Sequence, residues 1–187
     1  MAADNQSIYF LHGLDSSGNG TKGKFFAKNF PQINSPNFHG ELATRIHQLE
    51  KLCNEDKNIT LIGSSFGGLM ASCFAENNRE RVSKLILMAP ALNFEDYAPP
   101  EPAIDVPTLL IIGNRDDVTP MDPVIDLAGK TFTNLTIWIS DDDHMLHNSF
   151  THLDWEKLLD TDIDFSSLHP PSGVVKNFID EKSRLAQ

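Results

Sequence analysis

The sequence predicts an α/β fold: a doubly wound, mostly parallel sheet with helices on both faces. The first observation is a series of short apolar runs without polar alternation, which is typical of strands that are covered on both faces. The second is that segments whose apolar residues recur at helical spacing lie between these runs. The third is that reactive side chains directly follow several runs, at the strand ends where ligands gather in such sheets.

The expected elements alternate regularly along the chain. Strands are expected at residues 8–11, 32–35, 59–62, 85–88, 109–112 and 135–139. One helix is expected where apolar residues share a face, at Leu42, Ile46, Leu49 and Cys53. A more fully buried helix is expected after the third strand, at Leu69, Met70, Cys73 and Phe74. This alternation is typical of a sheet layered between helices.

The third expected strand leads into Gly-Ser-Ser-Phe-Gly at residues 63–67, which matches the pattern G-x-S-x-G between a strand and a helix. Such a turn exposes the central serine, brings a base near it and aims backbone N–H groups at a developing oxyanion. Ser65 has glycine two positions before it and two after it, as the tight turn requires, whereas Ser64 has bulky residues there. Ser65 is therefore the candidate nucleophile.

A candidate acid and a candidate base follow the fifth and sixth expected strands. Asp116 and Asp117 are adjacent, and their side chains point apart on a turn, so that only one of them can meet an imidazole. His144 follows the sixth strand, and His147 competes with it from a position further along the loop. Serine, acid and histidine thus appear in that order, each just past a strand. Asp117 and His147 stay open as alternatives.

This order, together with the elbow and with His12-Gly13 after the first strand, resembles the α/β-hydrolase superfamily. By length and by Leu-His-Gly-Leu-Asp-Ser-Ser at residues 11–17, the chain is similar to the small, cap-less bacterial esterase-like members. The resemblance covers residues 8–159. It implies Ser65 as nucleophile, His144 as general base and Asp116, in the pattern G-x-x-D, as the acid that orients the imidazole.

The activity that this resemblance implies is hydrolysis of a small carboxylic ester or thioester through an acyl-enzyme on Ser65. The backbone N–H groups of Leu14 and Phe66 would form the oxyanion hole. His39, after the second strand, and Phe94, after the fourth, are candidate substrate-binding residues. The alternative is a catalytically idle α/β-hydrolase fold that serves as a binding or interaction module, because a fold alone does not establish an activity.

The segment 89–108 contains five prolines in the place where larger hydrolases often insert a helical cap. Proline removes a backbone donor and breaks helices, so this segment is not expected to form a cap. The sequence therefore predicts an open, shallow site that suits small or exposed acyl groups.

Two motifs raise other kinds of site. Gly18, Gly20 and Gly23 match the pattern G-x-G-x-x-G of dinucleotide sites. However, they begin several residues beyond the strand, and the next strand offers no acidic residue for a ribose. Three consecutive aspartates precede His144, but consecutive carboxylates diverge, and no second histidine-carboxylate group stands at metal spacing. We therefore expect neither a cofactor nor a metal.

Composition narrows the expected partners. The net charge of -11 and the pI near 4.9, without clustered lysine or arginine, argue against nucleic acid. No apolar stretch approaches membrane-spanning length, and residues 1–6 lack the features of a secretory signal. We expect a cytoplasmic protein that acts on a small-molecule acyl substrate without a membrane partner. The oligomeric state is left open.

The length of 187 residues suits one compact core. Residues 1–160 are expected to form a single α/β-hydrolase domain, and residues 161–187 a C-terminal extension. Apolar residues in this extension predict a final helix, at Val174, Val175, Phe178 and Ile179. We expect it to dock on the domain, and a role in binding a partner stays open as the alternative.

Overall fold

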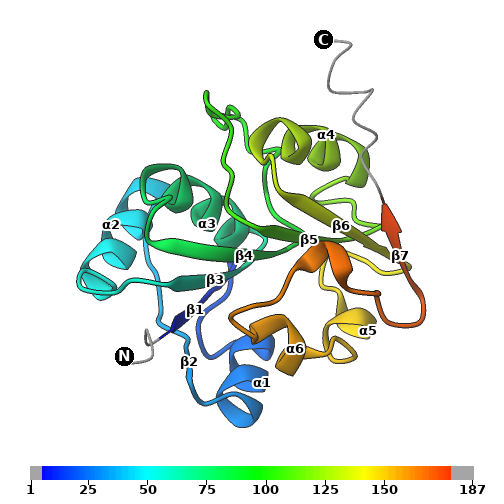
Figure 1. Cartoon of the computed structure of the whole chain (residues 1–187), viewed down its shortest axis with the longest axis horizontal. Helices are drawn as coiled ribbons and strands as arrows, with labels where there is room; N and C mark the ends of the chain where they lie inside the picture. Colours follow the sequence, from blue (N-terminus) through cyan, green and yellow to red (C-terminus); the bar gives the residue numbers. More distant parts are fainter. Residues whose placement is uncertain (1–5, 178–187) are drawn as a thin grey trace.

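The computed structural model describes residues 6–177, which contain a seven-stranded sheet with helices on both faces (Figure 1). The strand order is β2-β1-β3-β4-β5-β6-β7. The pairs from β2 to β6 are parallel, and β7 pairs antiparallel with β6. The strands are β1 Ser7–Leu11, β2 Ile33–Asn34, β3 Ile59–Ser64, β4 Val82–Met88, β5 Thr108–Gly113, β6 Leu135–Ser140 and β7 Val174–Asn177. The predicted fold class is confirmed.

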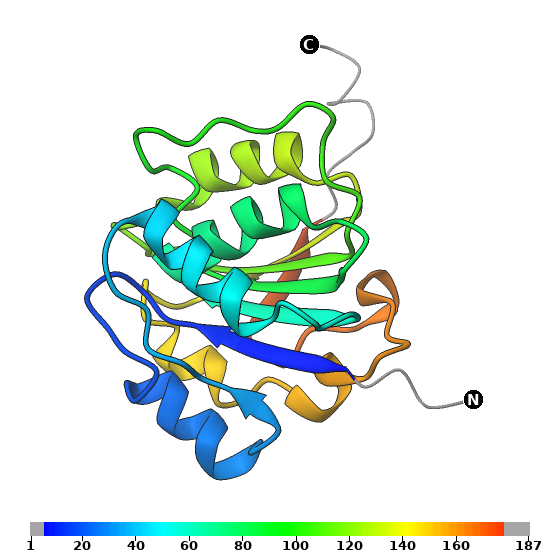
Figure 2. The same cartoon turned by 90° about the vertical axis from the view of Figure 1, so that its left-hand side faces the viewer.

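The helices divide between the two faces of the sheet (Figure 2). One face carries α2 Leu42–Leu52, α3 Phe66–Asn77 and α4 Met121–Thr131. The other carries α1 Thr21–Asn29, α5 His147–Phe150 and α6 Trp155–Leu159, and a 3-10 helix follows at Phe165–Ser167. Within residues 6–177, no helix combines the length and the apolar character that a membrane crossing requires.

Two apolar cores result because successive side chains of a strand point to opposite faces. In β1, Tyr9 and Leu11 belong to the core under α2 and α3, whereas Ile8 and Phe10 belong to the core that contains Phe26 of α1. Strands buried on both sides explain why the sequence shows continuous apolar runs rather than alternation.

The winding of the sheet positions the loops that carry reactive residues. Because β1 lies between β2 and β3, the chain leaves β1 toward α1 on one face and leaves β3 toward α3 on the other. This is the reversal point at which open α/β sheets bind ligands. In the strand register, Leu11 is paired with Gly63, and Gly113 is paired with Ser140. The loops after β1, β3, β5 and β6 therefore open at the same edge.

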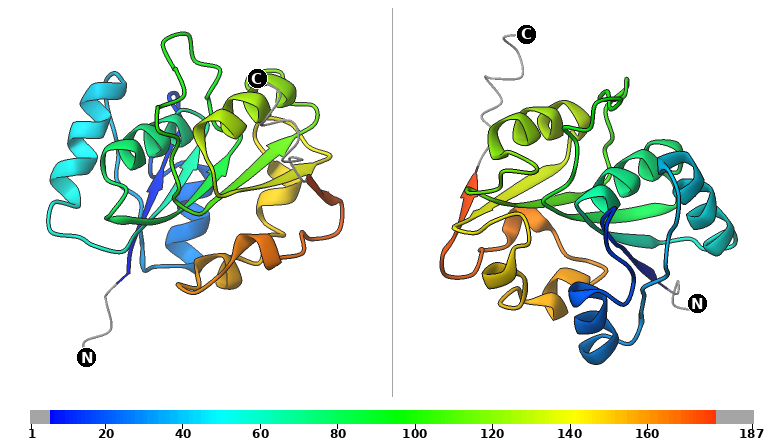
Figure 3. Two further views of the ribbon diagram at one scale, coloured as in Figure 1. Left: turned by 45° about the horizontal axis from the view of Figure 1, so that its top comes forward. Right: turned by 180° about the vertical axis from the view of Figure 1, so that it is seen from behind.

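Residues 89–107, between β4 and β5, rise from the sheet as a loop (Figures 1 and 3). Several contacts fasten the loop. Among them, the Tyr97 hydroxyl lies 2.7 Å from Thr131 Oγ1 of α4, and Arg79 donates to the Ala103 carbonyl at 2.7 Å. It contains no helix, so this part of the chain forms no cap domain, as the prolines predicted.

The C-terminal segment differs from its prediction. Val174 and Val175 start the strand β7 and not a helix, while Phe178 and Ile179 lie outside the described residues. Val174 packs against the core that contains Trp138 of β6, and Val175 is 67% exposed. Two adjacent β-branched residues suit this alternation, and pairing with β6 satisfies backbone groups of both strands. The division into 1–160 and 161–187 stays a prediction.

Candidate active site

Ser65 occupies the sharp turn between β3 and α3. Its backbone has φ 55° and ψ -120°, a conformation that non-glycine residues rarely adopt and that costs about 1–3 kcal/mol. The Ser65 N–H donates to the Met88 carbonyl at 2.9 Å, and the Ser65 carbonyl accepts from the Ala91 N–H at 3.0 Å. The strand β4 and the residues after it thus hold the strained backbone from both sides.

The two glycines of the motif are required by close contacts. A Cβ atom on Gly63 would lie 2.5 Å from the Gly67 carbonyl oxygen, and one on Gly67 would lie 2.0 Å from the Leu11 carbonyl oxygen. Real Cβ atoms essentially never approach backbone this closely. Glycine at both positions therefore lets α3 start directly against β1 and β3.

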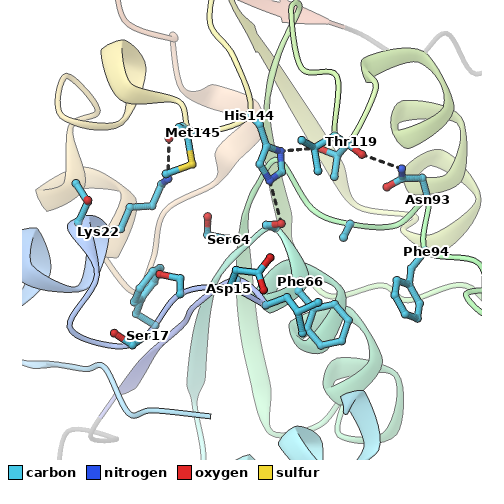
Figure 4. Close-up of a pocket in the computed structure, with 18 of the residues that line it drawn as sticks. Asp15, Ser17, Lys22, Ser64, Phe66, Asn93, Phe94, Thr119, His144 and Met145 are labelled. Carbon is cyan, nitrogen blue, oxygen red and sulfur yellow. Dashed lines mark hydrogen bonds between the residues drawn. The ribbon is translucent and has the colours of Figure 1, made fainter. Parts of the chain in front are cut away.

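The structure brings Ser65, His144 and Asp116 into one hydrogen-bonded chain. His144 Nε2 lies 3.0 Å from Ser65 Oγ, and His144 Nδ1 lies 2.9 Å from Asp116 Oδ2. In Figure 4 a dashed line joins the imidazole of His144 to Thr119. The competing residues Asp117 and His147 are both exposed. The geometry therefore favours Asp116 and His144 over them.

Asp116 is held rigidly, and Thr119 is the residue that sequence reasoning missed. The backbone N–H groups of Val118 and Thr119 donate to Asp116 Oδ1 at 2.9 and 2.7 Å. The Thr119 hydroxyl donates to Oδ2 at 2.6 Å and lies 3.2 Å from His144 Nδ1. An Asp followed by Thr three positions later is a local signal for such a turn. Asp116 is thus oriented by its own loop before it meets the imidazole.

The loop after β1 approaches the nucleophile closely. A Cβ atom on Gly13 would lie 3.4 Å from Ser65 Cβ. His12 Nε2 accepts from the Phe38 N–H at 2.9 Å, so its proton is on Nδ1, which donates to the Gly13 carbonyl at 2.8 Å. Burial lowers the pKa of His12, in agreement with this neutral form. His12 thus orients the loop.

The two candidate oxyanion donors border one cavity with Ser65. Leu14 and Phe66 both line it. Phe66 is the first residue of α3, so its N–H belongs to the first-turn donors that have no partner within the helix. The helix N-terminus also carries partial positive charge, which stabilises a nearby anion.

The cavity has a volume of about 710 Å³, in the range of small-molecule sites. Phe94 lines it, with its ring 5.5 Å from that of Phe66. Four lining side chains are large, apolar and well exposed, at Leu14, Phe94, Val118 and Met145. They give the mouth of the cavity an apolar rim (Figure 4 labels Phe94 and Met145).

His39 does not line this cavity, contrary to its proposed role. Its backbone N–H donates to Gln48 Oε1 at 3.1 Å, and its carbonyl accepts from Gln48 Nε2 at 3.0 Å. These bonds fasten the chain to α2, and the His39 side chain is exposed. Its place after a strand was a sound signal, but β2 lies at the edge of the sheet, one strand away from the reversal point.

The glycines of the segment 18–23 allow backbone atoms to pack closely against each other. A Cβ atom on Gly18 would lie 2.0 Å from the Ser35 carbonyl oxygen, and one on Gly23 would lie 1.8 Å from the Gly18 carbonyl oxygen. Lys22 from this segment lines the cavity and donates to the Met145 carbonyl at 2.7 Å (Figure 4). Burial lowers the pKa of Lys22, and the carboxylates of Asp142 and Asp143 oppose this shift. The segment thus ties α1 to the loop that carries His144.

Two of the three aspartates before His144, Asp141 and Asp142, make contacts that hold the loop. Asp141 pairs with Arg115 at 2.8 Å, which joins the acid loop to the histidine loop. Asp142 is buried, and its Oδ2 accepts from the Ser149 hydroxyl at 2.6 Å and from the backbone N–H groups of Asn148 and Ser149. Burial alone would raise the pKa of Asp142, but these bonds, the Ser149 hydroxyl first, outweigh it, so the pKa is lowered.

Asp142→Asn is expected to lower the free energy of unfolding near pH 7 by about 2 kcal/mol, because a buried charged acceptor is lost. A folded-state pKa below the unfolded value of about 3.9 stabilises the fold above that value. This contribution disappears as the pH falls through the folded-state pKa. Urea unfolding at several pH values should therefore give a difference between wild type and variant that shrinks only below about pH 4. Asp141→Asn, at an exposed pair, is the control and should change stability by less than about 1 kcal/mol.

Comparison with known proteins agrees with the fold. A family model described as alpha/beta hydrolase fold matches residues 2–101, more than half of the chain. The chain therefore belongs to the alpha/beta hydrolase fold family. The resemblance predicted from the sequence is confirmed, and the family supports hydrolase activity.

Individual relatives fit the same class. The chain is 31% identical over 114 residues to phytyl ester synthase 1, chloroplastic, of Arabidopsis thaliana, a match over 55% of this chain. The match spans only 16% of that relative's length. An esterase from Exiguobacterium antarcticum superposes with a TM-score of 0.66 at 16% identity, over 83% of this chain and 91% of the esterase. A monoacylglycerol lipase from Paleococcus ferrophilus superposes with a TM-score of 0.58 at 17% identity, over 73% and 85%. At such identities the two structures show a shared fold.

Proposed function

We propose that the protein is a serine hydrolase that cleaves a small carboxylic ester or thioester through an acyl-enzyme on Ser65. The observation that carries the proposal is the unbroken chain of hydrogen bonds from Ser65 through His144 to Asp116. A serine hydroxyl needs such a base, and the base needs such an acid, to act as a nucleophile. The printed names of the relatives, an ester synthase, an esterase and a monoacylglycerol lipase, support ester chemistry.

The reaction follows from these positions. His144 Nε2 takes the hydroxyl proton as Ser65 Oγ bonds to the acyl carbon, and Asp116 stabilises the imidazolium that forms. The negative charge on the former carbonyl oxygen is met by the N–H groups of Leu14 and Phe66. His144 then returns the proton to the departing alcohol or thiol. Water, activated by the same imidazole, releases the acid from Ser65.

The lining of the cavity supports a neutral acyl substrate. The apolar rim suits the carbon chain of an ester, and residues 89–107 form no cap over the approach. Asp15, Glu95 and Asp96 also line the cavity, and their charge disfavours strongly anionic substrates. The proposal includes a cytoplasmic location and a reaction without a cofactor, nucleic acid or membrane.

A fluorophosphonate probe tests the proposal, because it phosphonylates a serine that is activated as a nucleophile, with loss of fluoride. We expect rapid labelling of the wild type, loss of labelling in Ser65→Ala, and retained labelling in Ser64→Ala, which removes the neighbouring hydroxyl that also lines the cavity. Intact-mass measurement reads the adduct. Wild-type protein that stays unlabelled would favour the alternative, an idle fold used as a binding module, and labelling of Ser65→Ala would show that the nucleophile is another residue.

A further inference from the structure

Arg45 is a buried charged residue on the apolar face of α2. It follows Leu42 by three positions and precedes Leu49 by four, so it shares their face of the helix. Its residue surface is 4% exposed. None of the ion pairs found among residues 6–177 includes Arg45. A buried cation is expensive unless it is compensated, so its contacts require an explanation.

The contacts of Arg45 are backbone carbonyls of the loop after β1. Nη2 donates to the Leu14 carbonyl at 3.1 Å and Nη1 to the Gly13 carbonyl at 3.4 Å. Nε donates to the Gly40 carbonyl at 3.0 Å, just before α2 begins. The planar guanidinium thus joins two consecutive carbonyls of the loop to α2 in one fork, which lysine could not reproduce.

Holding these carbonyls also sets the direction of a candidate oxyanion donor. The Gly13 carbonyl and the Leu14 N–H belong to one peptide unit, which is planar and trans, so the two groups point in opposite directions. The Gly13 carbonyl is held by Arg45 and by His12 Nδ1. The direction of the Leu14 N–H is therefore determined by what holds the Gly13 carbonyl.

Arg45 also contacts the residue that carries the other candidate donor. Its guanidinium carbon lies 5.2 Å from the ring centroid of Phe66, within the range of a cation–π interaction. Burial lowers the pKa of Arg45 from its ordinary value, and the charge of Asp15 opposes this. Arginine stays protonated even so, and its positive charge lies beside both halves of the oxyanion hole.

We infer that Arg45 is a positioning residue for the oxyanion hole, which holds the Gly13–Leu14 peptide and the Phe66 ring in the arrangement that the transition state requires. This inference rests on the proposed function. It assigns a catalytic effect to a side chain that lies outside the hydrogen-bonded chain of Ser65, His144 and Asp116. A substitution that weakens stabilisation of the oxyanion lowers kcat and the affinity for transition-state analogues. A substitution that only destabilises the fold lowers neither of them in the molecules that stay folded.

Arg45→Met, which keeps the apolar stem, and Arg45→Lys, which keeps the charge, test the inference. With p-nitrophenyl acetate we expect Arg45→Met to lower kcat at least about tenfold, toward the roughly 100-fold that loss of an oxyanion donor produces, with KM nearly unchanged. An alkylboronic acid, whose adduct with serine is tetrahedral and anionic, should bind more weakly by a similar factor. Arg45→Lys should be intermediate, because it keeps the charge but not the fork.

Arg81→Met is the matched control. Arg81 also fastens loop carbonyls with its guanidinium, those of Cys53, Asn54 and Asp56, but it precedes β4 at the opposite edge of the sheet. Its loss should lower the melting temperature and leave kcat and boronate affinity per folded molecule unchanged.

The outcomes separate the inference from the proposed function. Folded Arg45 variants with wild-type kcat, or with reduced kcat but wild-type boronate affinity, would overturn the inference alone. If Arg45→Met does not fold, Arg45→Lys decides by the same two measurements. Wild-type protein that is not labelled by a fluorophosphonate would overturn the proposed function, and the inference with it.

Discussion

Asp116→Asn is expected to lower kcat by about 10⁴-fold while the fold stays intact, as an uncharged partner that selects the wrong tautomer does in other triads. The structure gives the reason. Asp116 Oδ1 accepts from the N–H groups of Val118 and Thr119, so the amide oxygen of asparagine must take that position. Its NH₂ group then faces His144 Nδ1, which must become an acceptor, and the ring proton moves to Nε2 beside Ser65. An imidazole in that tautomer cannot take the serine proton.

Asp117→Asn is the matched control, since it changes an exposed carboxylate at the next position of the same loop. Steady-state kinetics on a p-nitrophenyl ester, together with circular dichroism, should show an unchanged rate for this variant. A large loss in Asp117→Asn and a small one in Asp116→Asn would contradict the assignment of the acid.

Gly67→Ala is expected to destabilise the protein by about 3–5 kcal/mol, the upper range for a single substitution. Helix propensity alone predicts the opposite, a gain of about 1 kcal/mol, because Gly67 lies within α3. The new Cβ atom, however, would lie 2.0 Å from the Leu11 carbonyl oxygen and 2.8 Å from that of His12. Both are backbone atoms that cannot rotate away, so α3 must move from β1. The steric term therefore outweighs propensity.

Gly173→Ala makes the same substitution at a position with nothing within 4 Å of the added atom. Its only cost is the positive φ of 83°, about 1–2 kcal/mol. Chemical denaturation of the two variants should separate them clearly. Equal losses at both positions would mean that α3 does not begin as tightly against β1 as described. Because a displaced α3 also moves Ser65 and Phe66, activity should fall with stability in Gly67→Ala only.

Much of the architecture could be predicted because its signals are local. Strands that are buried on both faces have continuous apolar runs in the sequence. The glycines at positions 63 and 67 indicate a turn with no room for a Cβ atom at either position. At Val174 and Val175 the predicted helix is a strand, because a short apolar pair suits strand and helix equally and pairing with the edge of β6 stabilises the strand.

Other residues could not be assigned because their roles depend on partners far along the chain. His39 follows a strand, as a site residue should, but it does not line the cavity, which is formed by other loops. Arg45 is recognisable in the sequence as a charged residue on the apolar face of a helix. Its role can be inferred only from the structure, which shows that it donates to the carbonyls of Gly13 and Leu14.

By itself, the sequence determined the layered α/β fold and the nucleophile candidate, since apolar periodicity and glycine spacing act over a few residues. Only the tertiary structure shows that Asp116 and His144 form the hydrogen-bonded chain with Ser65, while Asp117 and His147 are exposed. The hydroxyl and the imidazole are 79 residues apart in the chain. Their meeting depends on strand register and on the direction in which each loop side chain points, which no local pattern encodes.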